Sequence, residues 1–146
     1  MSVALFTYGT LMVEEIMAAL AGKPLPSREA VLKGFQRFRM RGEIYPGIGP
    51  ATGHETRGRL YVAMDDETMA LLDAFEGEQY HRQPLTVTTA DGTSQAAETY
   101  LLASSFSHCR TDRPWEIEQF TSRHLTRFLV QCRRFRAKAR EAKKTF

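Results

Sequence analysis

Two short stretches of the chain combine residue types that could do chemistry. The first, Tyr8–Leu11, has the sequence YGTL and joins a short apolar run to a segment with helical periodicity. Gly9 has no Cβ, so a ligand can approach its backbone closely, and the free N–H groups at a helix start attract anions. A structural interpretation is equally open, in which the side chain of Thr10 caps the following helix.

The second stretch, LLDAFEGEQYHR, contains a glutamate in an unusual position. Glu76 falls in the last turn of a predicted helix, directly before Gly77. A carboxyl at this end faces the negative end of the helix dipole, and burial beside Phe75 and Tyr80 would raise its pKa further. A carboxyl that titrates near neutrality suits general acid and base catalysis. On these residues alone, a plain surface glutamate remains the alternative, and Glu78 is expected to face solvent.

Predicted strands and helices alternate around these two stretches. Short runs rich in β-branched and aromatic residues predict strands over 3–8, 29–42, 56–64, 83–90 and 96–104. Helical periodicity is expected over 11–22 and 67–77, and in a long C-terminal segment that opens at Pro114. The segment 43–53 is rich in glycine and proline and is expected to form turns.

Individual residues mark the expected boundaries and bends. Gly34 is expected to bend the second strand, and Gly22 to end the first helix. Asp65 or Asp66 offers an N-cap to the second helix. Asp91 is followed by glycine, which predicts a hairpin between the last two strands.

The apolar faces of the helices indicate how the elements pack. In the first helix the inner face is formed by Ile16, Met17 and Leu20, and the last helix has a long apolar stripe that includes His124. A histidine on such a stripe is expected to be a core residue rather than a ligand. Together, the predicted elements indicate an α+β fold with five or six strands, two short helices and one long C-terminal helix.

Length and composition are those of an ordinary soluble domain. The 146 residues suit one domain, with 42% hydrophobic and 25% charged residues. No apolar run approaches the length needed to span a bilayer, and the N-terminal apolar segment is too short for a signal peptide. These features predict a single domain over residues 1–146. They also predict that the protein is cytoplasmic and has no membrane partner.

The sequence contains no metal or cofactor motif. The four histidines are scattered without ligand spacing, and no Walker A, GxGxxG, HExxH or GxSxG sequence is present. Cys109 and Cys132 are expected to be free thiols, one in a loop and one buried in a helix. We therefore expect no metal and no cofactor.

The positive charge is concentrated at the C-terminus. Residues 133–144 hold seven of the 20 basic residues and one of the 17 acids, so the remaining body is net negative. A basic helical tail over 133–146 could touch nucleic acid or anionic lipid. Because no aromatic stacking platform accompanies the charge, a solvated helix end is the preferred interpretation and no nucleic acid partner is expected.

Taken together, these segments resemble the γ-glutamyl cyclotransferase-like superfamily. YGTL resembles its substrate-binding loop, and LLDAFEGEQYHR resembles the segment that ends in its catalytic glutamate. The stretch Val31–Pro46 and Trp115 resemble most the branch that contains avirulence-induced plant proteins, whereas Thr10 and Leu11 after Gly9 are closer to the γ-glutamylamine cyclotransferase branch. The resemblance runs in order along roughly residues 3–130, which is nearly the whole chain.

The resemblance implies a fold, a reaction and a set of roles. The fold would be a small mixed β-barrel flanked by helices, and the substrate a small γ-glutamyl compound that is converted to 5-oxoproline and a free amine. Glu76 would be the general base and then acid. The backbone of Tyr8, Gly9, Thr10 and Leu11 would hold the α-carboxylate of the substrate.

Tyr80 and Arg82 also match the family pattern. Tyr80 would line the pocket, and Arg82 would line or support it. A module that binds a γ-glutamyl-like metabolite without converting it is the alternative to an enzyme.

Overall fold

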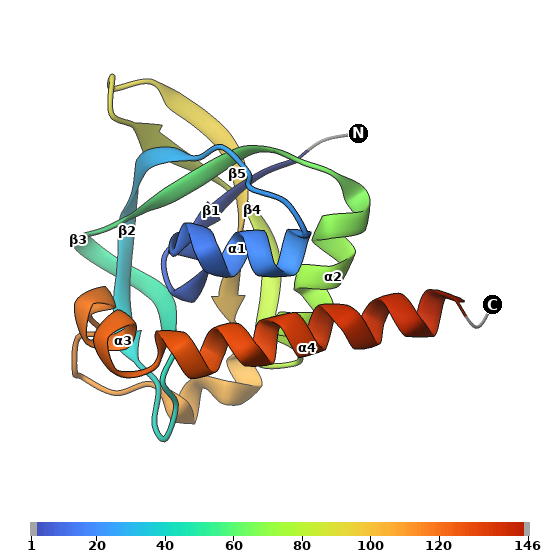
Figure 1. Ribbon diagram of the computed structural model, residues 1–146. Helices are drawn as coiled ribbons and strands as arrows, with labels where there is room; N and C mark the ends of the chain where they lie inside the picture. Colours follow the sequence, from blue (N-terminus) through green and yellow to red (C-terminus); the bar gives the residue numbers. More distant parts are fainter. Residues whose placement is uncertain (1–2, 145–146) are drawn as a thin grey trace.

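The computed structural model describes residues 3–144 as five strands, four helices and two 3₁₀ turns. The strands are β1 (Val3–Thr7), β2 (Arg28–Arg39), β3 (Pro46–Met64), β4 (Tyr80–Thr89) and β5 (Ser94–Leu102). The helices are α1 (Glu14–Ala21), α2 (Asp66–Glu76), α3 (Ile117–Arg123) and α4 (Leu125–Lys144). The 3₁₀ turns are η1 (Thr10–Met12) and η2 (Ser104–Cys109). Figure 1 shows these elements along the chain.

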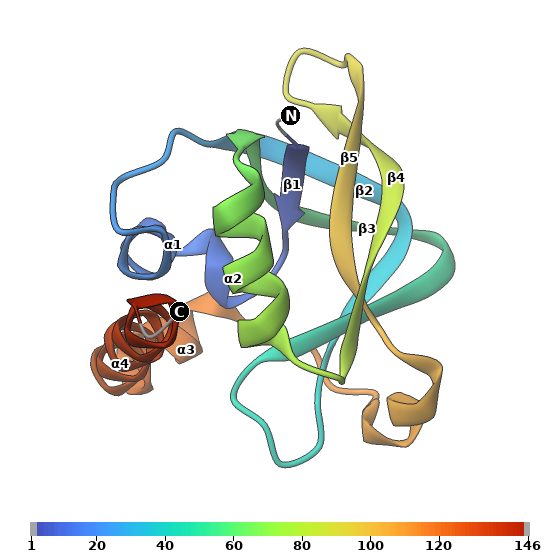
Figure 2. The same cartoon turned by 90° about the vertical axis from the view of Figure 1, so that its right-hand side faces the viewer.

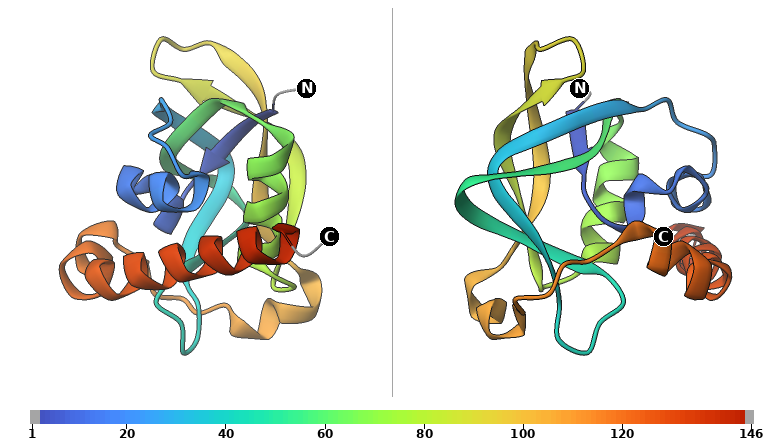
Figure 3. Two further views of the ribbon diagram at one scale, coloured as in Figure 1. Left: turned by 45° about the vertical axis from the view of Figure 1, so that its right-hand side comes forward. Right: turned by 90° about the vertical axis from the view of Figure 1, so that its left-hand side faces the viewer.

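The strands close into a small mixed barrel. Their order around the barrel is β1-β3-β2-β4-β5, with β1 parallel to β5 and the pairs β1–β3, β2–β3, β2–β4 and β4–β5 antiparallel. The four helices lie together on one side of the barrel, with α4 alongside α1 (Figures 2 and 3). This confirms the predicted class of fold, with five strands and a long C-terminal helix.

Long strands β2 and β3 form most of the barrel wall. Gly34 has a φ of +83° at a register shift between Lys33 and Phe35, which confirms the predicted bend. The prediction of turns over 43–53 is wrong from residue 46 onward, because β3 already begins at Pro46. Residues 46–50 pair with the end of β2, and Ile48 is 1% exposed. Cross-strand pairing and burial therefore override the weak strand propensity of glycine and proline here.

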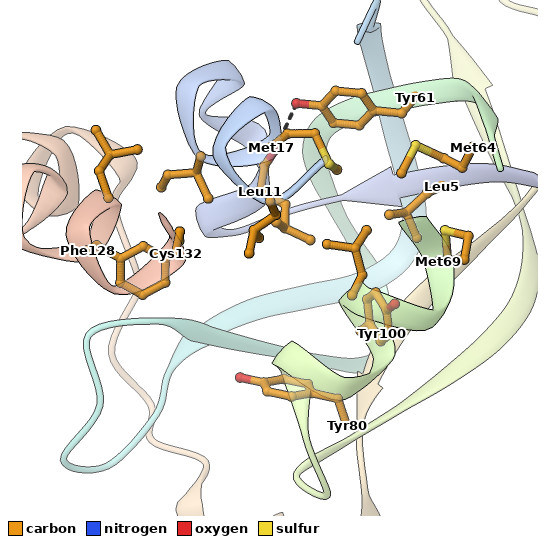
Figure 4. Packing of buried hydrophobic residues seen from close by; sticks show 14 of the residues in the cluster. Leu5, Leu11, Met17, Tyr61, Met64, Met69, Tyr80, Tyr100, Phe128 and Cys132 are labelled. Carbon is orange, nitrogen blue, oxygen red and sulfur yellow. Dashed lines mark hydrogen bonds between the residues drawn. The ribbon is translucent and has the colours of Figure 1, made fainter. Parts of the chain in front are cut away.

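Alternating side chains of β1 serve two cores. Leu5 faces a cluster between the barrel and the helices, and its neighbour Phe6 faces a cluster inside the barrel. Ile16, Met17 and Leu20 of α1 are buried in the first cluster, as predicted. Figure 4 shows how this cluster continues from α4 to the residues beneath α2.

The C-terminal segment is two helices and not the predicted single one. His124 separates α3 from α4 with backbone angles outside the helical region, although its N–H still donates to the carbonyl of Phe120 at 2.8 Å. In a straight helix Phe120 and Phe128 would lie about 12 Å apart along the axis. The break brings their rings to 5.3 Å, edge to face. His124 is half-buried at this break with its ring 6.2 Å from that of Phe120, so it is not the core residue that the sequence predicted.

The basic residues at the C-terminus belong to the second half of α4. Arg133, Arg134, Lys138 and Arg140 are exposed there. Among the described residues, no helix combines the length and the apolar character needed to cross a bilayer.

Candidate active site

The chain turns sharply between β1 and α1. The N–H of Met12 donates to the carbonyl of Gly9 at 3.0 Å, and that of Val13 donates to Thr10 at 3.1 Å. Helix α1 begins only at Glu14, with Val13 before it and no side-chain cap. The interpretation of Thr10 as the cap of this helix is therefore wrong. Its side chain is instead buried within the turn, at 7% exposure.

Pro46 leaves no room for a side chain at position 9, so this position requires glycine. A Cβ at this position would lie 2.7 Å from Cγ of Pro46 and 2.8 Å from Cδ. Contacts this short do not occur, so any side chain at Gly9 must push Pro46 away. Pro46 is the first residue of β3, and sequence analysis missed it because 43–53 was predicted to be a loop.

Hydrogen bonds with three strands, β2, β3 and β5, hold the turn in place. Tyr61 of β3 donates from its hydroxyl to the carbonyl of Leu11 at 2.9 Å, drawn as a dashed line in Figure 4. Tyr8 donates to the carbonyl of Tyr100 on β5 at 2.5 Å. Arg37 of β2 donates to the carbonyl of Tyr8 at 2.9 Å. The turn is thus fixed from several directions by groups that do not depend on a ligand.

Glu76 is the last residue of α2 and faces this turn across a recess. Gly77 follows with a φ of +76° and ends the helix, and Glu78 beyond it is exposed, as predicted. Burial raises the pKa of Glu76 to about 7, and the negative charge of Asp73 contributes in the same direction. The effect of Asp73 was missed in the sequence, where only the helix end and burial were considered.

The recess brings the predicted site residues together. It has an empty volume of about 340 Å³, part of it open to solvent. Glu76, Tyr80 and all four residues of the YGTL turn line it; the other lining residues are Phe6, Thr7, Tyr45, Pro46 and Tyr100. Figure 4 shows Tyr80 and Tyr100 below Leu11. An acid that titrates near neutrality therefore shares one recess with a fixed backbone turn.

Two residues around the recess have supporting positions. The hydroxyl of Tyr80 donates to the carbonyl of Pro46 at 2.7 Å, which links β4 to the start of β3. Trp115 donates from Nε1 to the carbonyl of Ile44 at 2.8 Å and so holds the loop that leads to Tyr45. Sequence reasoning missed Tyr45 because it lies in the segment predicted to be turns.

The described part of the chain offers no metal site. Within residues 3–144, histidine, cysteine, aspartate and glutamate side chains do not gather in a group that could hold an ion. Cys109 is half-buried at the end of η2, and Cys132 is buried in α4; both are free.

Comparison with known proteins identifies the family. Residues 5–120 match the family described as "Gamma-glutamyl cyclotransferase, AIG2-like", and the chain belongs to this family.

Relatives in plants cover most of the chain. AIG2-like protein D from Arabidopsis thaliana is 26% identical over 137 residues, which cover 90% of this chain and 88% of the relative. AIG2-like protein C from the same plant is 29% identical over 137 residues, with coverage of 90% and 76%.

Solved structures share the fold at low sequence identity. The solution structure of an Arabidopsis thaliana protein superposes with a TM-score of 0.71 at 23% identity, over 92% of this chain and 81% of the other. A structure of a gamma-glutamyl cyclotransferase superposes with a TM-score of 0.65 at 19% identity, over 70% and 68%. At these identities the likeness is one of fold.

Proposed function

We propose that the protein is a γ-glutamyl cyclotransferase that converts a γ-glutamyl compound into 5-oxoproline and a free amine, with Glu76 as general base and acid. The single observation that supports this most is the carboxyl of Glu76, half-buried in the recess with its pKa raised to about 7. Such a group exchanges protons readily near neutral pH. Membership of the family makes ring closure of a γ-glutamyl group the reaction to test.

The reaction needs one proton carrier and a bent substrate. The substrate's α-ammonium group gives a proton to the carboxylate of Glu76, and the free amine then attacks the γ-carbonyl carbon. The new C–N bond closes a five-membered ring, and the original amide C–N bond breaks. Glu76 returns the proton to the departing nitrogen, and the ring nitrogen gives its second proton to the amine that leaves, which departs as an ammonium ion. Glu76 therefore ends as the carboxylate that it was at the start. Proton transfer of this kind contributes roughly 10²–10⁴-fold to a rate.

The YGTL turn is the proposed anchor for the substrate's α-carboxylate. The first N–H groups of a helical turn have no acceptor within the turn, and hydrogen bonds from Tyr61 and Arg37 fix the backbone around them. An anchored carboxylate would hold the α-amine near Glu76 and the γ-carbonyl within its reach. Tyr80, which lines the same recess, would contact the bound γ-glutamyl group.

The residues that follow Gly9 favour one class of leaving amine. In the sequence, Thr10 and Leu11 follow Gly9, which resembles the branch that acts on γ-glutamylamines. The proposed substrate class is therefore a γ-glutamylamine or a γ-glutamyl peptide. The remainder of the molecule would leave through the open side of the recess.

A panel of γ-glutamyl amines and γ-glutamyl dipeptides, assayed for release of 5-oxoproline, tests the proposal. At least one compound is expected to be converted by the wild-type protein, and Glu76→Gln should reduce its kcat/KM by roughly 10²–10⁴-fold. Glu78→Gln is the matched control, because the same substitution is made two residues away at an exposed position. It should retain wild-type turnover.

Two results would overturn the proposal. Equal turnover by Glu76→Gln and the wild type would remove Glu76 from the mechanism. Tight binding of a γ-glutamyl compound that stays intact over hours, with no compound of the panel converted, would make the protein a binding module.

A further inference from the structure

An ion-pair network lies directly behind Glu76, outside the recess. Arg82 of β4 contacts both carboxylate oxygens of Asp73, with Nε 3.0 Å from Oδ1 and Nη2 3.0 Å from Oδ2. Nη1 of the same guanidinium donates to Oε1 of Glu98 at 2.7 Å. The hydroxyl of Tyr100 donates to Oδ1 of Asp73 at 2.7 Å. A single arginine thus joins α2 to β4 and β5.

This network acts at the turn of helix that presents Glu76. Asp73 and Glu76 are three residues apart on α2, so their side chains are neighbours on the helix surface. Tyr100 lines the recess while its hydroxyl is bound to Asp73. Fixing Asp73 therefore fixes the last turn of α2 relative to the wall that carries Tyr100.

The charge near Glu76 depends on the same pair. Titratable groups face Glu76 from five elements: Asp73 on α2, Tyr8 after β1, Tyr80 on β4, Tyr100 on β5 and Cys132 on α4. Burial raises the pKa of all three phenols, and it raises the pKa of the Cys132 thiol to about 12. These four groups stay neutral below about pH 9. The carboxylate of Asp73, bound to Arg82, is left as the charged neighbour among the five.

We propose that Arg82 and Asp73 are a positioning pair for Glu76: the ion pair fixes the last turn of α2 against β4 and β5 and balances the negative charge that Glu76 faces. Neither residue contacts the substrate in this proposal. The catalytic meaning of the pair rests on the proposed function, whereas its effect on the titration of Glu76 does not.

The two members of the pair should act on Glu76 in opposite directions. Asp73→Asn removes the negative charge, so the pKa of Glu76 should fall. Arg82→Gln leaves the carboxylate of Asp73 without its counter-charge, so the pKa of Glu76 should rise. Both substitutions break the same contact, so a purely structural role would shift the pKa of Glu76 in one direction for both.

The experiment titrates Glu76 directly in the full-length, substrate-free protein. The ¹³C shift of its side-chain carboxyl is followed by NMR as a function of pH, and kcat/KM is measured over the same range. We expect the pKa of Glu76 to fall by about 0.5–1 in Asp73→Asn and to rise by about 0.5–1 in Arg82→Gln. The acidic limb of the kcat/KM profile should move with it, because Glu76 must be ionised to accept the proton of the substrate amine.

Two further variants separate charge from fold. Arg82→Lys keeps the positive charge but cannot contact both oxygens of Asp73, so the pKa of Glu76 should lie between its wild-type value and its value in Arg82→Gln. Lys23→Met removes a positive charge beside Asp65, at the other end of α2, and should leave the titration of Glu76 unchanged. If Arg82→Gln does not fold, a lowered pKa in Asp73→Asn together with the Arg82→Lys result still tests the pair.

The outcomes distinguish this inference from the proposed function. Opposite shifts without any release of 5-oxoproline would support the pair and contradict the cyclotransferase. Shifts in the same direction, or no shift in Asp73→Asn, would overturn the pair even if the wild-type protein releases 5-oxoproline.

Discussion

Helix α2 begins and ends at carboxyl groups that lie in opposite surroundings. At its start, Asp65 accepts a hydrogen bond from the N–H of Thr68 at 2.7 Å, and this bond lowers the pKa of the exposed carboxyl. At its end, burial and a like charge raise the pKa of Glu76 to about 7. A carboxylate at the N-terminus of a helix is favoured by the dipole, and one at the C-terminus is disfavoured.

The difference separates what serves the fold from what serves the proposed chemistry. Asp65 stabilises the helix through a local hydrogen bond with Thr68. Glu76 is placed where its charged form is costly, and the surrounding strands supply the contacts that keep it there. Substitutions at the first end should therefore change stability alone, whereas those around the second end should change activity as well.

Among substitutions that leave Glu76 in place, the largest effect is expected opposite it, at Gly9. Gly9→Val must displace Pro46, because even a Cβ would lie 2.7 Å from its Cγ. A displacement of about 1 Å in a substrate anchor can cost about 100-fold in rate, so kcat/KM for 5-oxoproline release should fall by about that factor. Thr10→Ser keeps the backbone and should stay within about 3-fold of the wild type. Equal losses in the two variants would show that side chains, and not the backbone, form the anchor.

An intermediate effect is expected on stability at the Glu76 end. Because the pKa of Glu76 is raised in the folded protein, the folded state binds this proton more tightly than the unfolded state does. Stability is therefore lost as the pH rises from about 4.5 to about 7. Glu76→Gln cannot ionise and should be more stable than the wild type at pH 8, by about 1–3 kcal/mol. Denaturant unfolding at pH 8 and pH 4 measures this, and the gain should vanish at pH 4.

The smallest effect is expected at the start of the helix. Asp65→Ala removes the N-cap and should lower the Tm at pH 7 by about 2–4 °C. Since the pKa of Asp65 is lowered in the folded state, its contribution is present above its unfolded pKa of about 3.9 and is lost as the pH falls through the folded value. Thermal melts at pH 7 and pH 2 test this sign. A loss of turnover in Asp65→Ala under native conditions would break the separation between the two ends.

Local signals in the sequence predicted both ends of α2 and the hairpin between β4 and β5. Gly77 ends the helix where its position suggested, and Asp65 is the cap. The hairpin between β4 and β5 follows from Asp91 and Gly92, since Gly92 has the φ of +84° that such a turn requires. These features depend on residues a few positions apart, so local chemistry decides them.

Features that depend on distant contacts were not predictable. Pro46 is a strand residue because β2 pairs with it, and its contact with Gly9 joins two segments that the sequence separates. The ion pair between Asp73 and Arg82 links a helix to a strand, and only the packed structure brings the two together. The break at His124 likewise accompanies a contact between Phe120 and Phe128, eight residues apart, that no local signal indicates.

The position of β1 in the barrel has a consequence for how the protein is made. Tyr8 binds Tyr100, 92 positions along the chain, and Thr99 donates to the carbonyl of Phe6 across 93 positions. Contacts of such separation form late, because long loops must close first. A nascent chain that has emerged from the ribosome only as far as the β4–β5 turn already contains both YGTL and Glu76. Its recess nevertheless lacks a wall until β5 follows, so the recess beside Glu76 can be complete only after Leu102 has been added.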